Sequence, residues 1–152
     1  MNNLDNLLNQ LESKIEHCEK LNQEISLVNV AWHIEHSLLT LDRITDLLIK
    51  SKPKDYKWKF NILRIIVLTI KKIPRGRAKV PEVVQPIGSI NNIILYKHLS
   101  ETRNRIKELE FISKDKYFKH PFFGDIKLRQ TINFLGIHTK HHLDIIEDII
   151  KR

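Results

Sequence analysis

The sequence is poor in the residues that build disulfides, turns and membrane spans. Its single cysteine, Cys18, excludes a disulfide framework, and also a thiolate zinc cluster or iron–sulfur site built by this chain alone. Four glycines and five prolines are too few for a β-sandwich or β-barrel. The longest apolar run, residues 65–70, is too short to cross a bilayer, and the first ten residues do not resemble a signal peptide. We therefore expect a soluble, cytoplasmic protein.

What the sequence does contain is leucine and isoleucine at helical spacing. Its 152 residues suit one domain, residues 1–152. Apolar residues at three- and four-residue intervals predict long helices over about 3–24, about 30–49, from a Ser89 cap to Leu109, and about 126–150. A shorter helix is expected near 58–69, and HPFFGD (120–125) is expected to be a turn with Asp125 as the next helix cap. These elements predict an all-α four-helix bundle with a long crossover between the second and third long helices.

The net charge of +8 is concentrated in that crossover. Residues 52–79 contain ten lysines and arginines against one acid, Asp55, whereas the rest of the chain has 16 basic and 17 acidic residues. Three interpretations remain open: a solvated loop, an anion-binding rim over an active site, or a nucleic-acid contact with Tyr56, Trp58 and Phe60 as stacking platforms. We expect no nucleic-acid partner, because the histidines described next point to small-molecule chemistry.

Five of the eight histidines fall into two clusters, WHIEH (32–36) and HTKHH (138–142). His138 and His142 are four residues apart, so they project from one side of a helix, in the middle of its apolar stripe. Two inward-facing imidazoles at this spacing can hold a divalent metal, with His36 or His33 on a facing helix as the third ligand. The alternative is a set of hydrogen-bonded core histidines, which would bury several ring nitrogens at a cost. The zincin motif HExxH is absent.

WHIEHSL, the HPFFG turn and HTKHH, in this order, resemble the DinB-like (YfiT-like) superfamily of metalloenzymes, most closely an uncharacterised branch of it. The resemblance spans essentially the whole chain. It implies a four-helix bundle in which three histidines hold a metal, and the matching positions are His36, His138 and His142. His33 and His141 are additional to this pattern, and the resemblance implies a structural role for His120.

Three neutral imidazoles leave a divalent ion with an open coordination position, so we expect a zinc or nickel ion that activates water or a thiol. The resembling families include S-transferases that use low-molecular-weight thiols such as bacillithiol or mycothiol, and hydrolases. Because such thiols carry carboxylates, Arg75 and Arg77 are candidates for an anion-binding rim. We expect Cys18 to be a core residue, and Glu35 to lie at the helix surface rather than beside the metal.

The sequence therefore predicts a metal-dependent enzyme acting on a small molecule, with catalytic residues unassigned. The alternative is a non-catalytic helical bundle that binds a metal or a polyanion. Among partners we expect the small-molecule substrate and a second copy in a homodimer, and no membrane.

Overall fold

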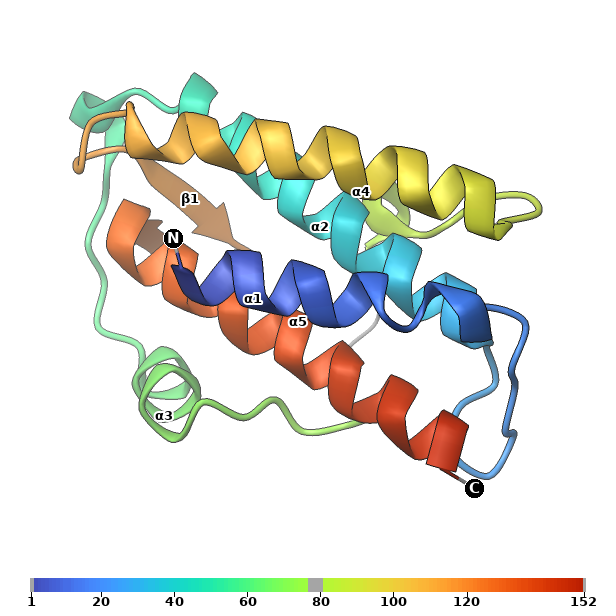
Figure 1. Ribbon diagram of the computed structural model, residues 1–152. Helices are drawn as coiled ribbons and strands as arrows, with labels where there is room; N and C mark the ends of the chain where they lie inside the picture. Colours follow the sequence, from blue (N-terminus) through green and yellow to red (C-terminus); the bar gives the residue numbers. More distant parts are fainter. Residues whose placement is uncertain (1, 77–80, 152) are drawn as a thin grey trace.

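The computed structural model describes residues 2–76 and 81–151, which are mostly helical (Figure 1). The α-helices are α1 (Asn2–Glu12), α2 (Val30–Lys50), α3 (Ile62–Ile70), α4 (Asn92–Lys107) and α5 (Leu128–Lys151). Two short strands, β1 (Tyr117–His120) and β2 (Gly124–Lys127), precede α5. Single 3-10 turns lie at Ile15–His17, Pro53–Asp55, Glu82–Val84 and Glu108–Glu110. The prediction of a helical protein is confirmed, although the strands make it more than all-α.

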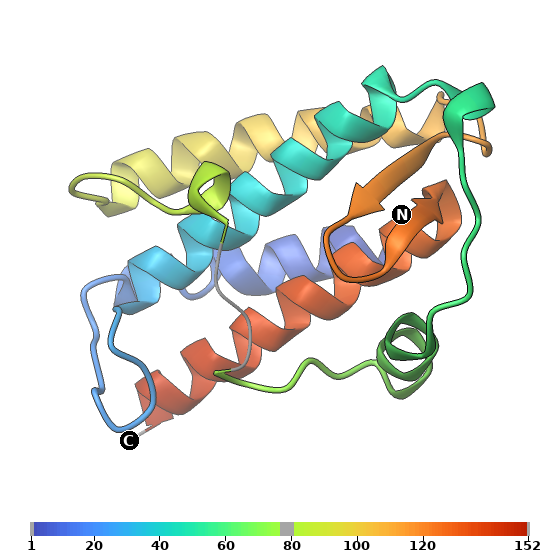
Figure 2. The same cartoon turned by 180° about the vertical axis from the view of Figure 1, so that it is seen from behind.

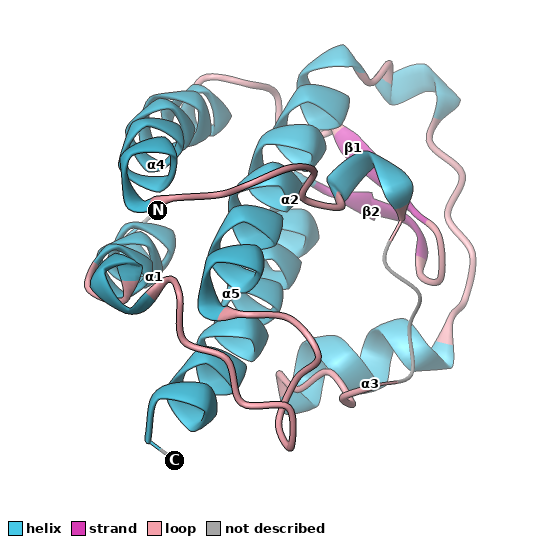
Figure 3. Ribbon diagram, turned by 90° about the vertical axis from the view of Figure 1, so that its right-hand side faces the viewer, coloured by secondary structure: helices cyan, strands magenta, loops and turns pink. Residues whose placement is uncertain are grey.

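Four of the helices enclose one core of leucine and isoleucine. Helix α2 packs against α4 and α5, and α1 packs against the same two helices (Figure 3). Residues on two sides of α2 are buried, as expected for a helix with several neighbours. The largest fully buried side chains come from all four helices and their connections: Leu4, Leu8, Leu11, Ile15, Ile34, Leu38, Leu41, Leu48, Leu95, Ile106, Ile126 and Leu135.

The N-terminal helix is shorter than the sequence predicts. Instead of running over residues 3–24, α1 ends at Glu12, and a 3-10 turn carries the chain to the buried Cys18. The carbonyls of Cys18 and Lys20 then accept from backbone N–H groups at the start of α2. The helical apolar spacing continues because the turn also buries Ile15, so periodicity alone does not reveal the break.

The segment predicted to be a turn is the tip of an antiparallel hairpin between α2 and α5 (Figure 2). Gly124 closes the tip with φ +70°, a conformation that favours glycine. Asp125 was expected to cap the last helix, which is wrong: it lies in β2, where its carboxylate accepts from the backbone N–H of Lys57 at 2.8 Å. Strand pairing therefore delays the start of α5 to Leu128.

The crossover between α2 and α4 contains α3, a nine-residue helix outside the main group of helices (Figures 1 and 2). It begins later than predicted, because the Asn61 side chain accepts from the N–H of Arg64 and caps it. The cap of α4 is likewise Asn91 rather than the predicted Ser89. Over the described residues, no helix combines the length and apolar character needed to cross a membrane.

Candidate metal centre

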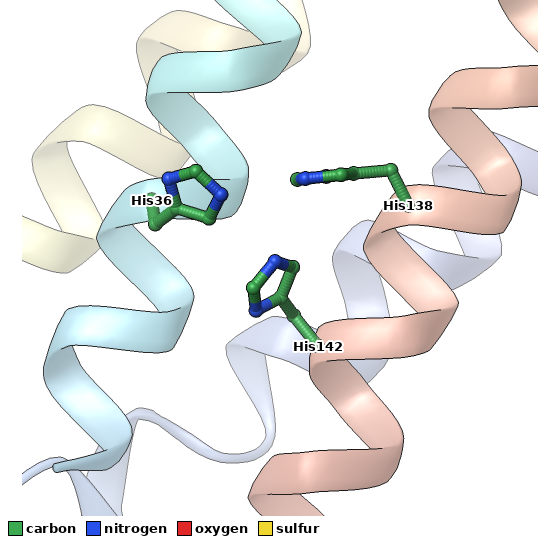
Figure 4. Close-up of side chains that lie close together, drawn as sticks. All are labelled: His36, His138 and His142. Atoms are coloured by element: carbon green, nitrogen blue, oxygen red, sulfur yellow. The ribbon is translucent and has the colours of Figure 1, made fainter. Parts of the chain in front are cut away.

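Three histidines converge between α2 and α5 (Figure 4). His36 projects from α2, and His138 and His142 project from successive turns of α5. One ring nitrogen from each can be chosen so that all three lie within 4.8 Å of one another. His36 and His142 are buried, whereas His138 is partly exposed. The structure thus brings together the three residues that the resemblance implies, in a group that could hold a metal ion.

The ring of His36 is oriented by the crossover. Its Nδ1 lies 2.8 Å from the carbonyl oxygen of Val84, which can only accept, so Nδ1 carries the proton. Nε2 is therefore left with a lone pair, the form that a metal requires. The indole of Trp32 stacks on the His36 ring, with the ring centroids 5.0 Å apart and an angle of 17° between the ring planes. Because Val84 is itself buried, this contact also holds the crossover against α2.

A second chain of contacts orients His142. Its Nδ1 lies 3.0 Å from Nδ1 of the buried His33, and Nε2 of His33 lies 2.9 Å from Oγ of Ser26. When His142 donates to His33 and His33 donates to Ser26, Nε2 of His142 has a free lone pair. Metal-binding histidines commonly donate their second N–H in this way. His33 therefore lies behind the group as a partner of His142, not within it.

Burial keeps the imidazoles neutral. It lowers the pKa of His36, and it lowers the pKa of His138 and His142 well below 6.5, with neighbouring histidines adding to the effect. Burial and the charge of His36 also lower the pKa of His33 to about 4. Neutral imidazole is the form that ligates metals, so the protein presents these rings ready to bind near neutral pH.

The donor set suits a transition metal. Zinc binds imidazole nitrogen at about 2.0–2.1 Å, which places tetrahedral ligands roughly 3.4 Å apart. The nitrogens here all lie within 4.8 Å of one another, so modest ring rotations would bring them into coordinating distance. Three imidazoles without a carboxylate or thiolate suit zinc and nickel better than magnesium or calcium.

Arg75, one of the two predicted rim residues, lies near this group. Its charge contributes to lowering the pKa of both His33 and His141, after the larger effect of burial. Its guanidinium also forms an ion pair with Asp148 of α5 at 2.9 Å. Arg77 lies outside the described residues. Of the two proposed rim residues, Arg75 is thus beside the histidines.

Two other predictions about the neighbourhood have different outcomes. His120 has the structural role that the resemblance implies: Nδ1 accepts from the backbone N–H groups of Phe122 and Phe123, and burial lowers its pKa to about 4. Glu35, expected at the helix surface, is instead largely buried and bonded at 2.9 Å to His98 of α4. No sequence motif indicates this pair, since His98 is the single histidine of its helix.

Sequence reasoning also missed the residues that orient the ligands. Val84 acts through its backbone carbonyl, which any residue supplies, and only its place between two prolines hints at a fixed segment. His33 could have been found from its position one turn before His36. Ser26 acts through a single hydroxyl seven residues before His33, a spacing that no motif marks.

Comparisons with protein-family models, with curated proteins and with solved structures find no match to this chain. The likeness to the DinB-like superfamily therefore depends on the short sequence motifs alone.

Proposed function

We propose that the protein is a DinB-like four-helix bundle that holds one divalent transition metal, zinc or nickel, on His36, His138 and His142. The proposal extends to an enzyme acting on a small molecule, as a thiol S-transferase or a hydrolase. The observation that carries it is the approach of three imidazole nitrogens to within 4.8 Å on two helices.

The hydrogen bonds behind the rings support this function. The Val84 carbonyl and His33 each engage Nδ1 of one proposed ligand and leave its Nε2 for coordination. Core histidines that served only packing would not need their free nitrogens directed at one another. When bound, a divalent ion at three neutral imidazoles supplies Lewis acidity and an open coordination position.

The chain's own residues would then bind and orient the substrate. Partial exposure of His138 gives a small molecule access to one side of the group. Arg75, which is about half exposed, can receive a carboxylate if it exchanges Asp148 for the substrate. Trp32, stacked on His36, excludes water from the opposite side of that ring.

The metal is tested by elemental analysis of protein purified without a histidine tag and incubated with zinc or nickel salts. We expect about one ion per chain in the wild type. His138→Ala should lose it, whereas His141→Ala, a neighbouring histidine outside the group, should keep it. A wild type that stays metal-free with both salts would overturn the proposal.

The thiol is tested separately with cobalt(II) in place of the native metal. Addition of a carboxylate-bearing thiol should change the visible absorption of the cobalt protein, and Arg75→Ala should weaken this binding with the metal content unchanged. A spectrum that no thiol alters, in a protein that holds its metal, would favour a hydrolase or a non-catalytic metal site.

A further inference from the structure

Helix α3 presents its apolar side to solvent. Seven of its nine residues are aliphatic, yet its only buried residues are Arg64 and Val67. At 100° per residue, the exposed side chains cover an arc of roughly 160°. That arc contains Thr69 and five large aliphatic residues, of which the most exposed is 61% accessible: Ile62, Leu63, Ile65, Ile66 and Ile70. A continuous apolar surface of this kind usually marks an interaction site.

The helix is fixed in this orientation by its one charged residue. The guanidinium of Arg64 points inward and donates to the carbonyls of Lys59 at 2.8 Å and of Phe123 and Asp125 at 3.4 Å. Rotating α3 to bury its isoleucines would turn Arg64 towards solvent, so these bonds would break and the carbonyls of Phe123 and Asp125 would lose this donor. The outward apolar face is therefore built into the fold.

Exposed aromatic residues lie next to α3 at its N-terminal end. Trp58 and Phe60 lie in the segment leading into the helix, and each is more than 60% exposed. The tip of the hairpin adds Phe122, which is adjacent because its carbonyl accepts from the Asn61 side chain at 2.8 Å. We call α3 together with Trp58, Phe60 and Phe122 the α3 face.

Lysines flank the α3 face on both sides. Lys57 and Lys59 precede the helix, and Lys71 and Lys72 follow it. All four are exposed, and none forms an ion pair with another residue that the structure describes. Between residues 56 and 76 the sequence contains no aspartate or glutamate. The occupant of the α3 face must therefore be apolar where it meets the isoleucines and anionic around them.

We propose that the α3 face docks on the surface of a membrane that contains anionic lipids. Aliphatic and aromatic side chains would enter the boundary between headgroups and acyl chains, and the four lysines would contact anionic headgroups. A second copy of the chain would bring two basic segments together, and a nucleic acid would leave the isoleucines in water. The proposal is independent of the metal centre.

Such docking is peripheral, so it agrees with the absence of a membrane-crossing helix among the described residues. The sequence-based expectation of no membrane partner depended on spanning segments, which this mode of binding does not use. At 1.5 Å per residue, α3 is about 14 Å long, enough to lie in the interface with one face inserted. The other helices would then lie outside the lipid, in the aqueous phase.

The experiment is sedimentation with vesicles of pure phosphatidylcholine and of phosphatidylcholine with phosphatidylglycerol. We expect the wild type to bind the anionic vesicles at least tenfold more strongly, with weaker binding at high salt. The fluorescence of Trp58, measured in a Trp32→Phe background, should shift to shorter wavelength on binding. Because Trp58 belongs to the α3 face, this shift identifies the part of the protein that enters the lipid.

Two pairs of variants separate the apolar and the charged contributions. Ile62→Glu with Ile66→Glu should reduce binding more than tenfold, whereas Leu27→Glu with Ile93→Glu, equally acidic and placed on exposed residues elsewhere, should reduce it much less. Each lysine near an anionic surface strengthens binding about fivefold. Changing the four flanking lysines to glutamine should therefore reduce binding more than changing Lys20, Lys97, Lys107 and Lys114.

Three outcomes would overturn the proposal. The first is absence of binding to anionic vesicles. The second is binding that the Ile62→Glu, Ile66→Glu variant retains, which would indicate adhesion of a basic segment to any polyanion. The third is a dimer in sedimentation equilibrium that this variant converts to a monomer, which would assign the α3 face to a second copy. Circular dichroism and thermal unfolding confirm that each variant is folded.

Discussion

Histidines lie on both sides of helix α2, in opposite electrostatic environments. Towards α5, His36 meets other imidazoles in an apolar interior, and burial lowers the pKa of the group. Towards α4, His98 lies between Glu35 and Asp42, with a carboxylate oxygen about 3 Å from each ring nitrogen. Burial alone would lower the pKa of His98, but hydrogen bonds to the two carboxylates outweigh it and raise the pKa to about 9.

The partners of an imidazole, more than its burial, therefore decide whether it is neutral or charged. A ring that meets only neutral neighbours keeps a lone pair and can serve as a ligand. A ring between carboxylates holds two protons and acts as a cation that ties α2 to α4. The same residue type thus supplies a candidate metal centre on one side of α2 and a structural ion pair on the other.

Removing one histidine from each side of α2 tests whether the two sides act separately. His142→Ala should weaken zinc binding by more than about 100-fold, since a coordinating nitrogen is lost. His98→Ala should change the zinc affinity little, because both of its nitrogens are engaged by carboxylates. Competition with a chromogenic zinc chelator measures both. Comparable losses in the two variants would mean that the sides are not separate.

The next largest effect is expected at His33. Residues that orient a metal ligand typically contribute 10–100-fold to metal affinity, so His33→Ala should weaken zinc binding by about that factor. His33→Gln, whose amide oxygen can still accept from His142, should recover part of the loss. His141→Ala is the matched control. A His33 variant without zinc, beside a His36→Ala variant that keeps it, would make His33 the ligand on α2.

Loss of the cation between α2 and α4 should affect stability rather than metal binding. His98→Leu leaves Glu35 without its cation and Asp42 with only the Arg105 guanidinium, 3.9 Å away, and we expect the free energy of unfolding to fall by about 2 kcal/mol. Urea unfolding measures the change. Adding Glu35→Gln and Asp42→Asn to His98→Leu should recover much of the loss. If the single variant were as stable as the wild type, the ion pair would contribute nothing.

The two sides of α2 should also respond to pH in opposite directions. Because the folded pKa of His98 is raised to about 9, its stabilisation is complete below about pH 6.5 and is lost as the pH rises through 9. The histidines between α2 and α5 have lowered pKa values, so the metal-free protein loses stability as the pH falls below about 6.5. Urea unfolding across pH should show both slopes, and His98→Leu should lack only the alkaline one.

The sequence was sufficient to predict the residues of the candidate centre, because the i,i+4 spacing of His138 and His142 places both side chains on one side of a helix. It was also sufficient for a mostly helical protein, since apolar periodicity follows directly from the helical repeat. Neither inference requires knowledge of long-range contacts. The choice of His36 over His33 came from the resemblance, and the contact of His33 with His142 gives it a physical basis.

What the sequence could not provide depends on contacts between distant segments. In the hairpin, Phe118 pairs with Ile126 across a tip closed by Gly124. The carboxylate of Asp125 accepts a hydrogen bond from the backbone N–H of Lys57, which lies 68 residues away in the chain. The partner of His36 is a backbone carbonyl 48 residues along the chain. The outward apolar face of α3 could not be inferred either, because periodicity would place the isoleucines inside and Arg64 outside.

The smallest expected effect concerns Arg75, at the outer side of the histidines. Its positive charge adds to the burial that lowers the pKa of His141, so Arg75→Gln should raise that pKa in metal-free protein. The same change releases Asp148, whose freed carboxylate acts in the same direction. The exposed ion pair itself should contribute under about 1 kcal/mol to stability. Titration of the His141 ring protons by NMR measures the shift, with Lys72→Gln as a control that removes one charge from the same segment. If the titration of His141 were unchanged, the charge of the crossover would not act on the histidines, and the crossover would be a solvated loop.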